Sequence, residues 1–484
     1  MHARRALAAT GCCALLASAC GSEVPPNQFY RGGGGANNSS AATQVGDQGA
    51  LAGPVGSGTA LPSATGSTGP GNGGSGNGGG TGNGGGTTNG GGGTNGGNAV
   101  QGITAGSCVG FTNGHGITGS TINLANASDV SGPVPGLFTS AQQAAKAYVA
   151  YFNSTSTVCG RKLKMTNYDS RTSTIGDQDA ATAACGSSFA MVGSMGAFDS
   201  GGAKTVTDCG IPDLRAISTN PERVASPVAF GTDAINPPQV STAQYRYLKS
   251  ITGDAYKHAG LVYLDAGAAV PNAKADQKTA ESVGFHFDSV QAIDVTAFNY
   301  TPFASNMVKK GVKFVQYVGA WQYAIRLKNA MNEQGLTNAV FMMDSVAYDP
   351  AFVTSGADAI NGTYAFVNTV LFEEANRSPE MQLYLKWLRQ VAPNAHPSFF
   401  GVYAWGAMKL FAQLAVQLGG KLNRQTLLAA IRATHSFDAN GLFTTQDIGS
   451  KRTPGCQAVI QLQHGKWVRR SPYPYTCANV FDTR

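Results

Sequence analysis

Hydroxyl-bearing and aromatic side chains follow two short apolar runs of this chain, residues 189–192 and 214–217. The candidate ligand contacts after these runs are Ser194, Phe198, Ser200, Ser218 and Thr219. Taken singly, each is also a residue that an ordinary strand-to-helix turn uses. In an open parallel sheet, however, ligands bind outside the carboxyl ends of strands, where hydroxyls, backbone N–H groups and helix N-termini are available. The two loops together therefore predict a small-molecule site.

Three later apolar runs, 259–264, 314–318 and 340–343, also end in residues that could contact a ligand. These residues are Asp265, Trp321, Asp344 and Tyr348. The hydroxyls of the earlier loops suit a carboxylate or another acceptor, whereas Asp265 or Asp344 could hold a cation or a hydroxyl. The aromatic residues suit a flat or apolar molecule, since such pockets combine apolar walls with a few placed polar groups.

Motifs of enzymatic chemistry are missing from these loops. Neither Ser194 nor Ser200 lies in the hydrolase G-x-S-x-G motif, because Val192 and Phe198 occupy the first positions. The chain has no H-E-x-x-H, no phosphate-loop G-x-x-x-x-G-K and no dinucleotide G-x-G-x-x-G after its first strand. We therefore expect a protein that is not an enzyme and that needs no cofactor.

Strands and helices alternate along the chain and would place these loops at one edge of a sheet. Strand patterns occur at 121–127, 162–168, 189–192 and 214–217, and helical patterns at 140–152, 174–185 and 203–209. The alternation restarts with strand patterns at 259–264, 285–292, 314–318 and 340–343 and helical patterns at 272–283, 303–310 and 323–334. This rhythm predicts an α/β fold with two doubly wound parallel sheets.

The first residues have the features of a secretory signal. Arg4 and Arg5 precede an apolar run from Ala6 to Leu16, and small residues lead to Cys20. We assign 1–19 as a signal peptide and expect an exported chain. Cys20 resembles the lipidated Cys of the bacterial lipoprotein lipobox, although Ala17 stands where Leu is usual. A plain secretory peptide is the alternative.

Residues 20–105 are predicted to form a lipidated N-terminus and a flexible tether. Most of this stretch consists of Gly, Asn, Thr, Ser and Ala, with blocks such as GNGGSGNGGGTGNGGG. It has too little apolar surface to offset the entropy cost of ordering. We expect a cell-envelope lipoprotein tethered to the outer face of the cytoplasmic membrane through its lipid anchor.

Charge and hydropathy exclude two other classes of protein. The formal net charge of +7 comes from 34 basic and 27 acidic residues, which are dispersed along the chain, so we expect no nucleic-acid surface. The apolar stretch Phe399 to Leu418 is interrupted by Lys409, Gln413 and Gln417, which would form the polar face of a packed amphipathic helix. We do not expect it to span a membrane.

Six of the nine cysteines lie in the globular part, which argues for disulfides in an exported chain. They are Cys108, Cys159, Cys185, Cys209, Cys456 and Cys477. Their spacing lacks the close pairs and His partners of a metal site, so no metal is predicted.

Several stretches together resemble one known family. They are TINLANASDVSGPVPG, FNSTSTVCGRKLKMTNYDSRTST, FAMVGSMGAFDSGGAKTVTDCGIP and FGVYAWGAMKLFAQLAVQLGGKLNRQTLLAAIRAT. Their order and spacing are similar to those of the substrate-binding lipoproteins of branched-chain amino-acid type ABC transporters, which have the type I periplasmic binding fold. The resemblance extends from Gly116 to the end of the chain.

The resemblance implies a hinged clamp of two lobes joined by three crossings. The first lobe would hold 108–236 and 366–433, and the second 237–365 and 434–484. The strand-end loops named above would face each other across a cleft and hold a small organic solute, an amino acid or a similar molecule. The implied partners are the membrane permease and ATPase of an ABC importer, and we expect a monomer.

The family's strand order, 2-1-3-4-5, implies how the cysteines pair. Right-handed crossovers would place the second and third helices side by side, which brings Cys185 near Cys209. The first two strands would be neighbours, which leaves Cys108 for Cys159. Cys456 and Cys477 flank an expected hairpin with its turn near His464 and should bridge each other.

Two other functions stay open at this point. The same clamp fold also serves in sensing, so the chain could present its ligand to a separate signalling partner as a sensor lipoprotein. An exported serine hydrolase is the weaker alternative, because the nucleophile motif is absent.

Overall fold

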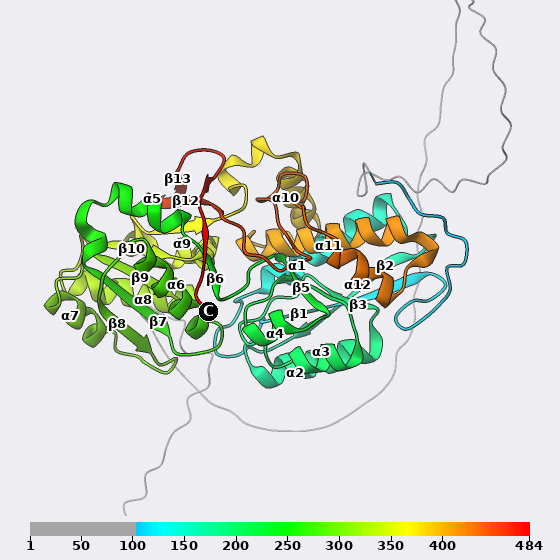
Figure 1. Ribbon diagram of the computed structural model, residues 1–484, viewed down its shortest axis with the longest axis horizontal. Helices are drawn as coiled ribbons and strands as arrows, with labels where there is room; N and C mark the ends of the chain where they lie inside the picture. The colour runs from blue at the N-terminus through cyan, green and yellow to red at the C-terminus, as the bar shows by residue number, and fades with distance from the viewer. Residues whose placement is uncertain (1–102) are drawn as a thin grey trace, which may run out of the picture. The chain divides into compact units, whose positions relative to one another are not determined.

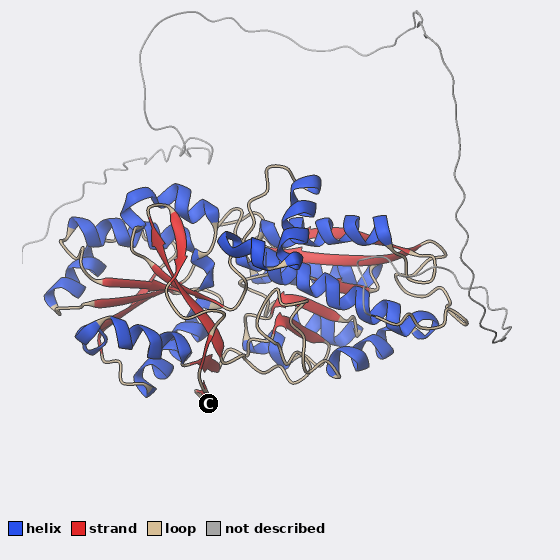
Figure 2. Cartoon of the chain, turned by 90° about the horizontal axis from the view of Figure 1, so that it is seen from above, coloured by secondary structure: helices blue, strands red, loops and turns tan. Residues whose placement is uncertain are grey.

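The computed structural model describes residues 103–484, which belong to one compact unit. The predicted signal peptide at 1–19, the lipidation site at Cys20 and nearly all of the predicted tether lie outside the described residues. The described part is an α/β structure with two large sheets, each covered by helices (Figures 1 and 2).

The first large sheet has five parallel strands in the order β2-β1-β3-β4-β5. Its strands are β1 (Thr121–Ser128), β2 (Lys162–Asp169), β3 (Ala190–Val192), β4 (Asp213–Ile217) and β5 (Ala229–Asp233). This order is the one that the family resemblance implied. Because all five strands are parallel, their carboxyl ends lie at one edge of the sheet.

Helices cover both faces of the five-stranded sheet. Those between its strands are α1 (Thr139–Thr155), α2 (Thr174–Ser187), α3 (Ala203–Cys209) and α4 (Pro221–Ala225), and three come from later in the chain: α10 (Pro379–Val391), α11 (Phe399–Leu418) and α12 (Arg424–Arg432). Helices α2 and α3 lie on one face, and α1 and α11 lie on the other (Figure 1). Local signals start these helices, since the side chain of Ser173 caps α2 and Asn423 forms a capping box in α12.

Helix α11 is a core helix, and one detail of its prediction was wrong. Among the described residues, Phe399–Lys421 alone has the length and apolar composition of a membrane span, and most of it is buried inside the protein. Lys409 was predicted to lie on a polar face, but it is buried and its Nζ lies 2.5 Å from the carboxylate of Glu380. A buried acidic partner on α10 removes the need for an exposed position.

The second large sheet has eight strands and is mixed. Its main path runs β13-β12-β11-β10-β9-β7-β8, and β14 also pairs with β12. The strands are β7 (Ala259–Leu264), β8 (Phe287–Ile293), β9 (Phe314–Val318), β10 (Val340–Met343), β11 (Tyr364–Val367), β12 (Cys456–Gln463), β13 (Lys466–Arg469) and β14 (Thr476–Cys477). Strands β7 to β11 are parallel, whereas β12 adds antiparallel to β11. The β12–β13 hairpin turns at His464 and Gly465, as predicted, and both have positive φ.

Most of the remaining elements cover the eight-stranded sheet or connect it to the first sheet, whereas the short turn at 419–421 lies between α11 and α12. The helices are α5 (Ala243–Ile251), α6 (Ala269–Ser282), α7 (Thr301–Lys309), α8 (Trp321–Glu333) and α9 (Pro350–Gly356). The short 3-10 helices are η3 (Gly253–Lys257), η4 (Ser345–Ala347), η5 (Ala357–Ile360), η6 (Phe372–Arg377) and η7 (Gly419–Lys421). A separate two-stranded sheet pairs β6 (Gln239–Ser241) with β15 (Val480–Asp482).

The chain passes between the two large sheets three times, after β5, after β11 and before β12. Hydrogen bonds hold the three crossings side by side. Asn368 Nδ2 donates to Asp233 Oδ1 over 3.0 Å, the Ala234 N–H donates to Gln446 Oε1 over 3.0 Å, and the Thr444 N–H donates to the Asn368 carbonyl over 2.8 Å. Three adjacent connecting segments are suitable as a hinge, because a few residues in each can absorb a domain rotation.

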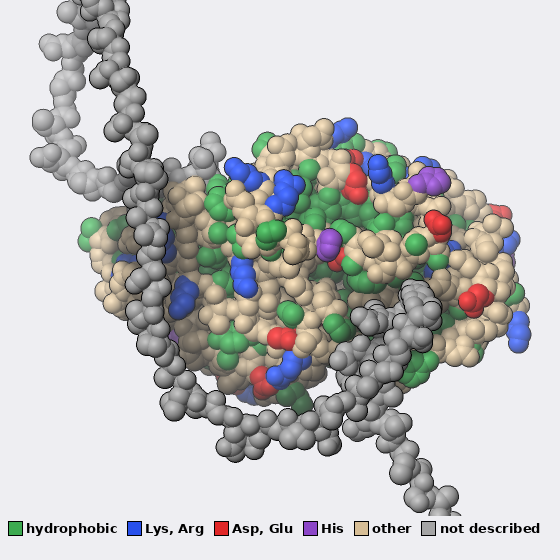
Figure 3. Space-filling model, turned by 180° about the vertical axis from the view of Figure 1, so that it is seen from behind, with side chains coloured by type: hydrophobic (Ala, Val, Ile, Leu, Met, Phe, Trp, Pro, Cys, Tyr) green, Lys and Arg blue, Asp and Glu red, His purple; other side chains and the backbone are tan. Residues whose placement is uncertain are grey.

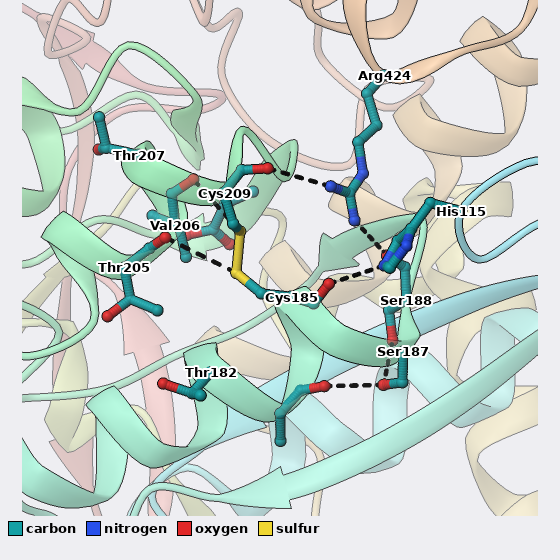
Figure 4. The surroundings of a disulfide bond; sticks show 12 residues. His115, Thr182, Cys185, Ser187, Ser188, Thr205, Val206, Thr207, Cys209 and Arg424 are labelled. Atoms are coloured by element: carbon teal, nitrogen blue, oxygen red, sulfur yellow. Dashed lines mark hydrogen bonds between the residues drawn. A yellow bond between two sulfur atoms is a disulfide. The ribbon is translucent and has the colours of Figure 1, made fainter.

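Three disulfides form the pairs that were predicted: Cys108–Cys159, Cys185–Cys209 and Cys456–Cys477. Figure 4 shows the second, which joins the ends of α2 and α3. His115 Nε2 lies 2.7 Å from the carbonyl oxygen of Cys185, and Arg424 Nη1 donates to the carbonyl of Cys209 over 3.2 Å. These contacts tie the bridge to its surroundings at the edge opposite the strands' carboxyl ends.

Charged side chains are dispersed over the face of the protein shown in Figure 3. Lys and Arg lie there among acidic and neutral side chains, without forming a continuous basic patch. The dispersion that the sequence shows along the chain therefore also holds in space on this face.

Candidate functional site

A cavity of about 290 Å³ lies between the two large sheets, beside the carboxyl ends of their strands. Both sheets contribute to its walls, and so do the first and third crossings. The walls are mainly apolar, with side chains that include Val134, Leu137, Phe138, Met195, Ile217, Leu264, Val318, Val346 and Phe400. The volume suits a small organic molecule.

Buried carboxylates fix the loops of the five-stranded sheet beside this cavity. Asp129, just after β1, accepts the Ala197 N–H over 2.8 Å, the Thr172 N–H over 3.1 Å and the Ser170 hydroxyl over 2.5 Å. It thereby connects the loops after β1, β2 and β3. Burial raises the pKa of Asp129, while these donors act in the opposite direction.

Asp199 plays the same role for the loop after β4. It accepts the Thr219 N–H over 2.9 Å and the Asn220 N–H over 3.0 Å, and its carboxylate lies 3.5 Å from Arg215 Nε. The Thr219 hydroxyl donates to the Gly196 carbonyl over 2.7 Å. Burial raises the pKa of Asp199, although the charge of Arg215 lowers it. Thr219 therefore uses both its N–H and its hydroxyl to hold the loop.

Ser218 differs from its neighbour because its hydroxyl has no hydrogen-bond partner. The residue is only 2% exposed and lines the cavity. A buried hydroxyl without a partner costs free energy, and a ligand that pairs with it recovers that cost. Ser218 is therefore the polar group of the first sheet that is most available to a ligand.

Two carboxyl groups line the opposite part of the cavity. Asp276 on α6 accepts from Gln316 Nε2 over 2.9 Å, and Asp344, after β10, accepts the Val346 N–H over 2.9 Å. Burial raises the pKa of Asp276 to about 8, with a further increase from the charge of Asp344. Burial likewise raises the pKa of Asp344 to about 6. Asp344 is partly exposed and lines the cavity.

The loops of the two sheets touch beside the cavity. The Ala268 N–H, after β7, donates to the Ala197 carbonyl, after β3, over 3.0 Å. Gly267 has φ of +51°, and a Cβ at this position would lie 2.7 Å from the Ala197 oxygen and 3.2 Å from the Phe198 ring. Only glycine fits this contact without a shift of one loop. The structure therefore has these two loops in contact.

Of the nine predicted ligand contacts, the structure places four on the cavity wall: Phe198, Ser218, Thr219 and Asp344. The other five lie outside the set of lining residues: Ser194, Ser200, Asp265, Trp321 and Tyr348. Ser194 is fully buried, and its hydroxyl accepts the Ala127 N–H over 3.1 Å between two strands. Ser200 begins the turn into α3, and Asp265 is exposed.

The two aromatic residues of this second group belong to the core instead. Trp321 begins α8, and the centroid of its ring lies 6.4 Å from that of the Phe352 ring. The ring of Tyr348 stacks on the Phe372 ring, with 4.8 Å between the ring centroids, and the Tyr348 hydroxyl donates to Glu373 over 2.6 Å. Their partners, Phe352, Phe372 and Glu373, do not line the cavity, and the sequence alone did not indicate these contacts.

Sequence reasoning missed Asp276, Gln244 and Asn272, which also line the cavity. A signal for Asp276 exists, because it lies on the buried face of α6 together with Ala273 and Ala280. An acidic residue in an apolar helical stripe is unusual unless it has a partner or a function. Gln244 and Asn272 carry no comparable signal.

The polar groups of the cavity wall can form hydrogen bonds with a small molecule. Within residues 103–484, His, Cys, Asp and Glu side chains form no group of three that could hold a metal ion. The polar groups at the wall are hydroxyl, amide and carboxyl groups on otherwise apolar surroundings. Such an arrangement binds a small molecule and selects it by shape and by hydrogen bonding.

Comparisons with known proteins agree with this description. The sequence profile of the periplasmic binding protein family matches residues 121–466. No curated protein sequence matches the chain. Many solved structures share the fold.

Three of those structures illustrate the range. A fatty acid ABC transporter substrate-binding protein from Thermomonospora curvata is 17% identical, with a TM-score of 0.65 over 77% of this chain and 95% of that one. The branched-chain amino acid binding protein LivJ from Streptococcus pneumoniae, in complex with isoleucine, is 16% identical, with a TM-score of 0.62 over 72% and 100%. A solute-binding protein from R. palustris, in complex with 4-hydroxybenzoate, is 16% identical, with a TM-score of 0.62 over 75% and 97%.

Proposed function

Because this chain belongs to the periplasmic binding protein family, we propose that it captures a small organic solute between its two sheets and delivers it to an ABC-type importer. The family consists of solute-binding proteins that work outside the cytoplasm. The observation that supports the proposal most directly is the cavity of about 290 Å³, whose walls come from strand-end loops of both sheets.

The solute is of amino-acid size and resembles an amino acid in having polar ends and an apolar middle. Ser218 offers a hydroxyl at one part of the wall, and Asp276 and Asp344 offer carboxyl groups at another. Apolar side chains line the space between them. The similar structures come from proteins whose names or bound molecules include isoleucine, 4-hydroxybenzoate and fatty acid, so the fold itself accommodates different solutes.

Binding closes a clamp in which the two sheets belong to separate lobes. The three adjacent crossings support this proposal, because their hydrogen bonds align them as one hinge. The Ala268–Ala197 hydrogen bond belongs to the closed form, in which the loops shield the solute from water. The lobe bounds that the family resemblance implied, 108–236 with 366–433 and 237–365 with 434–484, remain part of the proposal.

The loaded protein passes its solute to a membrane permease whose ATPase drives uptake. Cys20 carries the lipid anchor, and the Gly-rich segment lets the monomer reach its permease from the outer face of the cytoplasmic membrane. The composition of residues 20–105 and the secretory features of 1–19 support this arrangement.

The test is a thermal-shift screen of the full chain against amino acids, aromatic acids, short fatty acids and amines. A solute at a hundred times its Kd raises the free energy of unfolding by about 2.7 kcal/mol. Isothermal titration then measures the affinity of the best solute for two alanine variants. Ser218→Ala should weaken binding by about 2- to 10-fold, since a hydrogen bond contributes about 0.5–1.5 kcal/mol.

Ser200→Ala is the matched control, because Ser200 lies in the neighbouring loop but does not line the cavity. This variant should bind like the unaltered protein. If no solute stabilises the chain, the proposed function is wrong. If Ser200→Ala weakens binding and Ser218→Ala does not, the solute lies elsewhere.

A further inference from the structure

A lysine, a glutamate and an asparagine meet away from the cavity, where α10, α11 and the third crossing come together. Glu380 lies on α10, Lys409 lies on α11 and Asn440 lies in the third crossing. Glu380 is 5% exposed and Lys409 is 4% exposed. None of the three lines the cavity. Because they come from separate parts of the chain, only folding brings their side chains together.

One carboxylate oxygen of Glu380 contacts both of the other side chains. Lys409 Nζ lies 2.5 Å from Glu380 Oε2, and Asn440 Nδ2 donates to the same oxygen over 3.3 Å. The second oxygen, Oε1, accepts the indole N–H of Trp405 over 2.8 Å. The carboxylate therefore lies between the amine of the lysine and the amide nitrogen of the asparagine. From this position it can carry a proton from one nitrogen to the other.

Aromatic rings surround this carboxylate. Trp405 is fully buried. Three tyrosine rings pack around its indole, those of Tyr148, Tyr151 and Tyr384. Two charges are costly in such surroundings, and transfer of one proton from the Lys409 ammonium to the Glu380 carboxylate leaves an uncharged amine beside an uncharged acid. An uncharged lysine amine removed from water is a nucleophile.

The backbone holds Asn440 in a conformation that is unfavourable on its own. Ala439 has φ of +51° and Asn440 has φ of +63°, in the left-handed region that residues other than glycine seldom adopt. Asp438 secures this turn, because its carboxylate accepts the Asn440 N–H over 3.0 Å and its carbonyl accepts the Leu442 N–H over 2.9 Å. Strained backbone persists where the surrounding structure fixes it, and it gathers at functional sites. Here the strained turn presents the amide of Asn440 to Glu380.

We propose that Lys409 and Asn440 join in an intramolecular isopeptide bond, with Glu380 as the catalytic base and acid. Lys409 Nζ gives a proton to Glu380 and attacks Asn440 Cγ, so that a C–N bond forms. Glu380 then gives a proton to Asn440 Nδ2, the Cγ–Nδ2 bond breaks and ammonia leaves. Nζ gives up two protons in all, of which one leaves in the ammonia and the other stays on Glu380. Nothing is oxidised or reduced, and no second reactant is needed.

The ion pair of Lys409 and Glu380 is the starting state of this reaction. Freshly folded protein therefore holds the pair, and the bond forms from it with time. The product joins the third crossing covalently to α11, which packs on the five-stranded sheet. Like a disulfide, such a bond restricts the unfolded chain. The cavity takes no part in the reaction, so this inference is independent of the proposed solute binding.

The test is a tryptic peptide map of the full chain, refolded and sampled over time by mass spectrometry. Trypsin cuts after Lys and Arg, and it cannot cut at a lysine whose amine is part of an amide. With the disulfides reduced, the map should contain residues 390–421, uncut at Lys409, joined to residues 433–451. The joined species should be lighter than the sum of its two peptides by one ammonia. It should increase during incubation until it replaces nearly all of the separate peptides.

Three variants assign the bond to these residues. Lys409→Arg keeps a cation beside Glu380 but has no amine that attacks an amide, and it should give no joined peptide. Asn440→Ala removes the carbon that is attacked and should also give none; it changes an exposed residue, so it decides the question even if Lys409→Arg does not fold. Glu380→Gln keeps both partners but removes the proton carrier, and it should slow the joining about 100-fold or more.

Lys162→Arg is the matched control for the change of a lysine. Lys162 Nζ also lies beside an asparagine, but it donates to the backbone carbonyls of Asn153 and Ser156. This variant should form the joined peptide at the rate of the unaltered chain. Circular dichroism shows for each variant whether the fold is kept.

Two results would overturn the inference. One is a map of the unaltered chain that contains only the separate peptides after prolonged incubation. The other is a loss of ammonia that persists in Lys409→Arg, because it would place the reaction within the Asn440–Gly441 pair, as a succinimide, and not between two side chains. Neither result bears on solute binding, which the thermal-shift screen tests separately.

Discussion

Replacing Gly267 should weaken solute binding, because it destabilises the proposed closed form relative to the open form. In the structure, a Cβ at this position would lie 2.7 Å from the Ala197 carbonyl oxygen, closer than real Cβ atoms approach. Gly267→Ala must therefore separate the two loops and break the hydrogen bond from the Ala268 N–H to Ala197. In the proposed open form the two loops are apart, so we expect the variant to penalise closure specifically.

The size of the effect can be worked from these contacts. Alanine at a φ of +51° costs roughly 1–2 kcal/mol, but this cost enters the open and the closed forms alike. The lost hydrogen bond adds about 0.5–1.5 kcal/mol to the closed form alone, and displacing the Phe198 ring adds to it. We expect affinity to fall about tenfold, which corresponds to about 1.4 kcal/mol.

Gly335→Ala provides the matched control. Gly335 has φ of +79°, and an added Cβ would meet nothing within 4 Å. Both variants should lose similar stability in urea, but only Gly267→Ala should bind the best solute of the screen more weakly in titration calorimetry. Small-angle scattering with that solute should also show a larger radius of gyration for Gly267→Ala. Equal affinities for the two variants would refute the loop contact as part of closure.

Three further predictions concern stability. Lys409→Met should lower the free energy of unfolding by about 3–5 kcal/mol in urea denaturation, because it leaves the buried Glu380 carboxylate without its cation. Adding Glu380→Gln should recover most of this loss. A cost below about 1 kcal/mol for the single variant would contradict the importance of the ion pair. Burial raises the pKa of Asp233 to about 7, so the folded state keeps a proton that the unfolded state releases near pH 4. The free energy of unfolding should therefore fall by up to about 1.4 kcal/mol per pH unit as the pH rises from about 4 to about 7. Asp233→Asn should remove that contribution, and an unchanged difference in stability between the two proteins across this range would show that Asp233 does not take up the proton. Replacing Cys185 and Cys209 together with Ala should lower stability by about 2–4 kcal/mol without changing solute affinity, since the bridge joins the ends of α2 and α3; a loss of affinity would place the bridge in the binding mechanism.

The order of the five-stranded sheet was expected from the family resemblance, and this order, combined with handedness, predicted which cysteines pair. Apolar runs such as 214–217 mark strands, and right-handed crossovers constrain how successive strands lie. Strand β5 at Ala229–Asp233 and strand β11 at Tyr364–Val367 were not predicted. Both are short and lie within stretches without clear alternation, so their pairing depends on partners that are distant in the sequence.

Ser194 and Ser218 show why the positions of site residues were harder to predict. Both follow a buried strand in the sequence, and both are serines with less than a tenth of their surface exposed. Ser194 lies where the Ala127 N–H needs an acceptor, so its hydroxyl is used within the sheet. Ser218 has no such neighbour and remains available at the cavity wall. The two serines therefore differ because only Ser194 has a neighbouring backbone N–H group that uses its hydroxyl.

The buried acids extend this argument from serines to charge. Asp129 and Asp199 each accept two or more backbone N–H groups, so their acceptor capacity serves the loops of the five-stranded sheet. Asp344 accepts one backbone N–H and Asp276 accepts from the Gln316 side chain, and both line the cavity. Since the sequence shows four similar aspartates, only the fold reveals which of them have capacity left. That remaining capacity lies at the cavity wall, where Asp276 and Asp344 can accept a hydrogen bond from a solute.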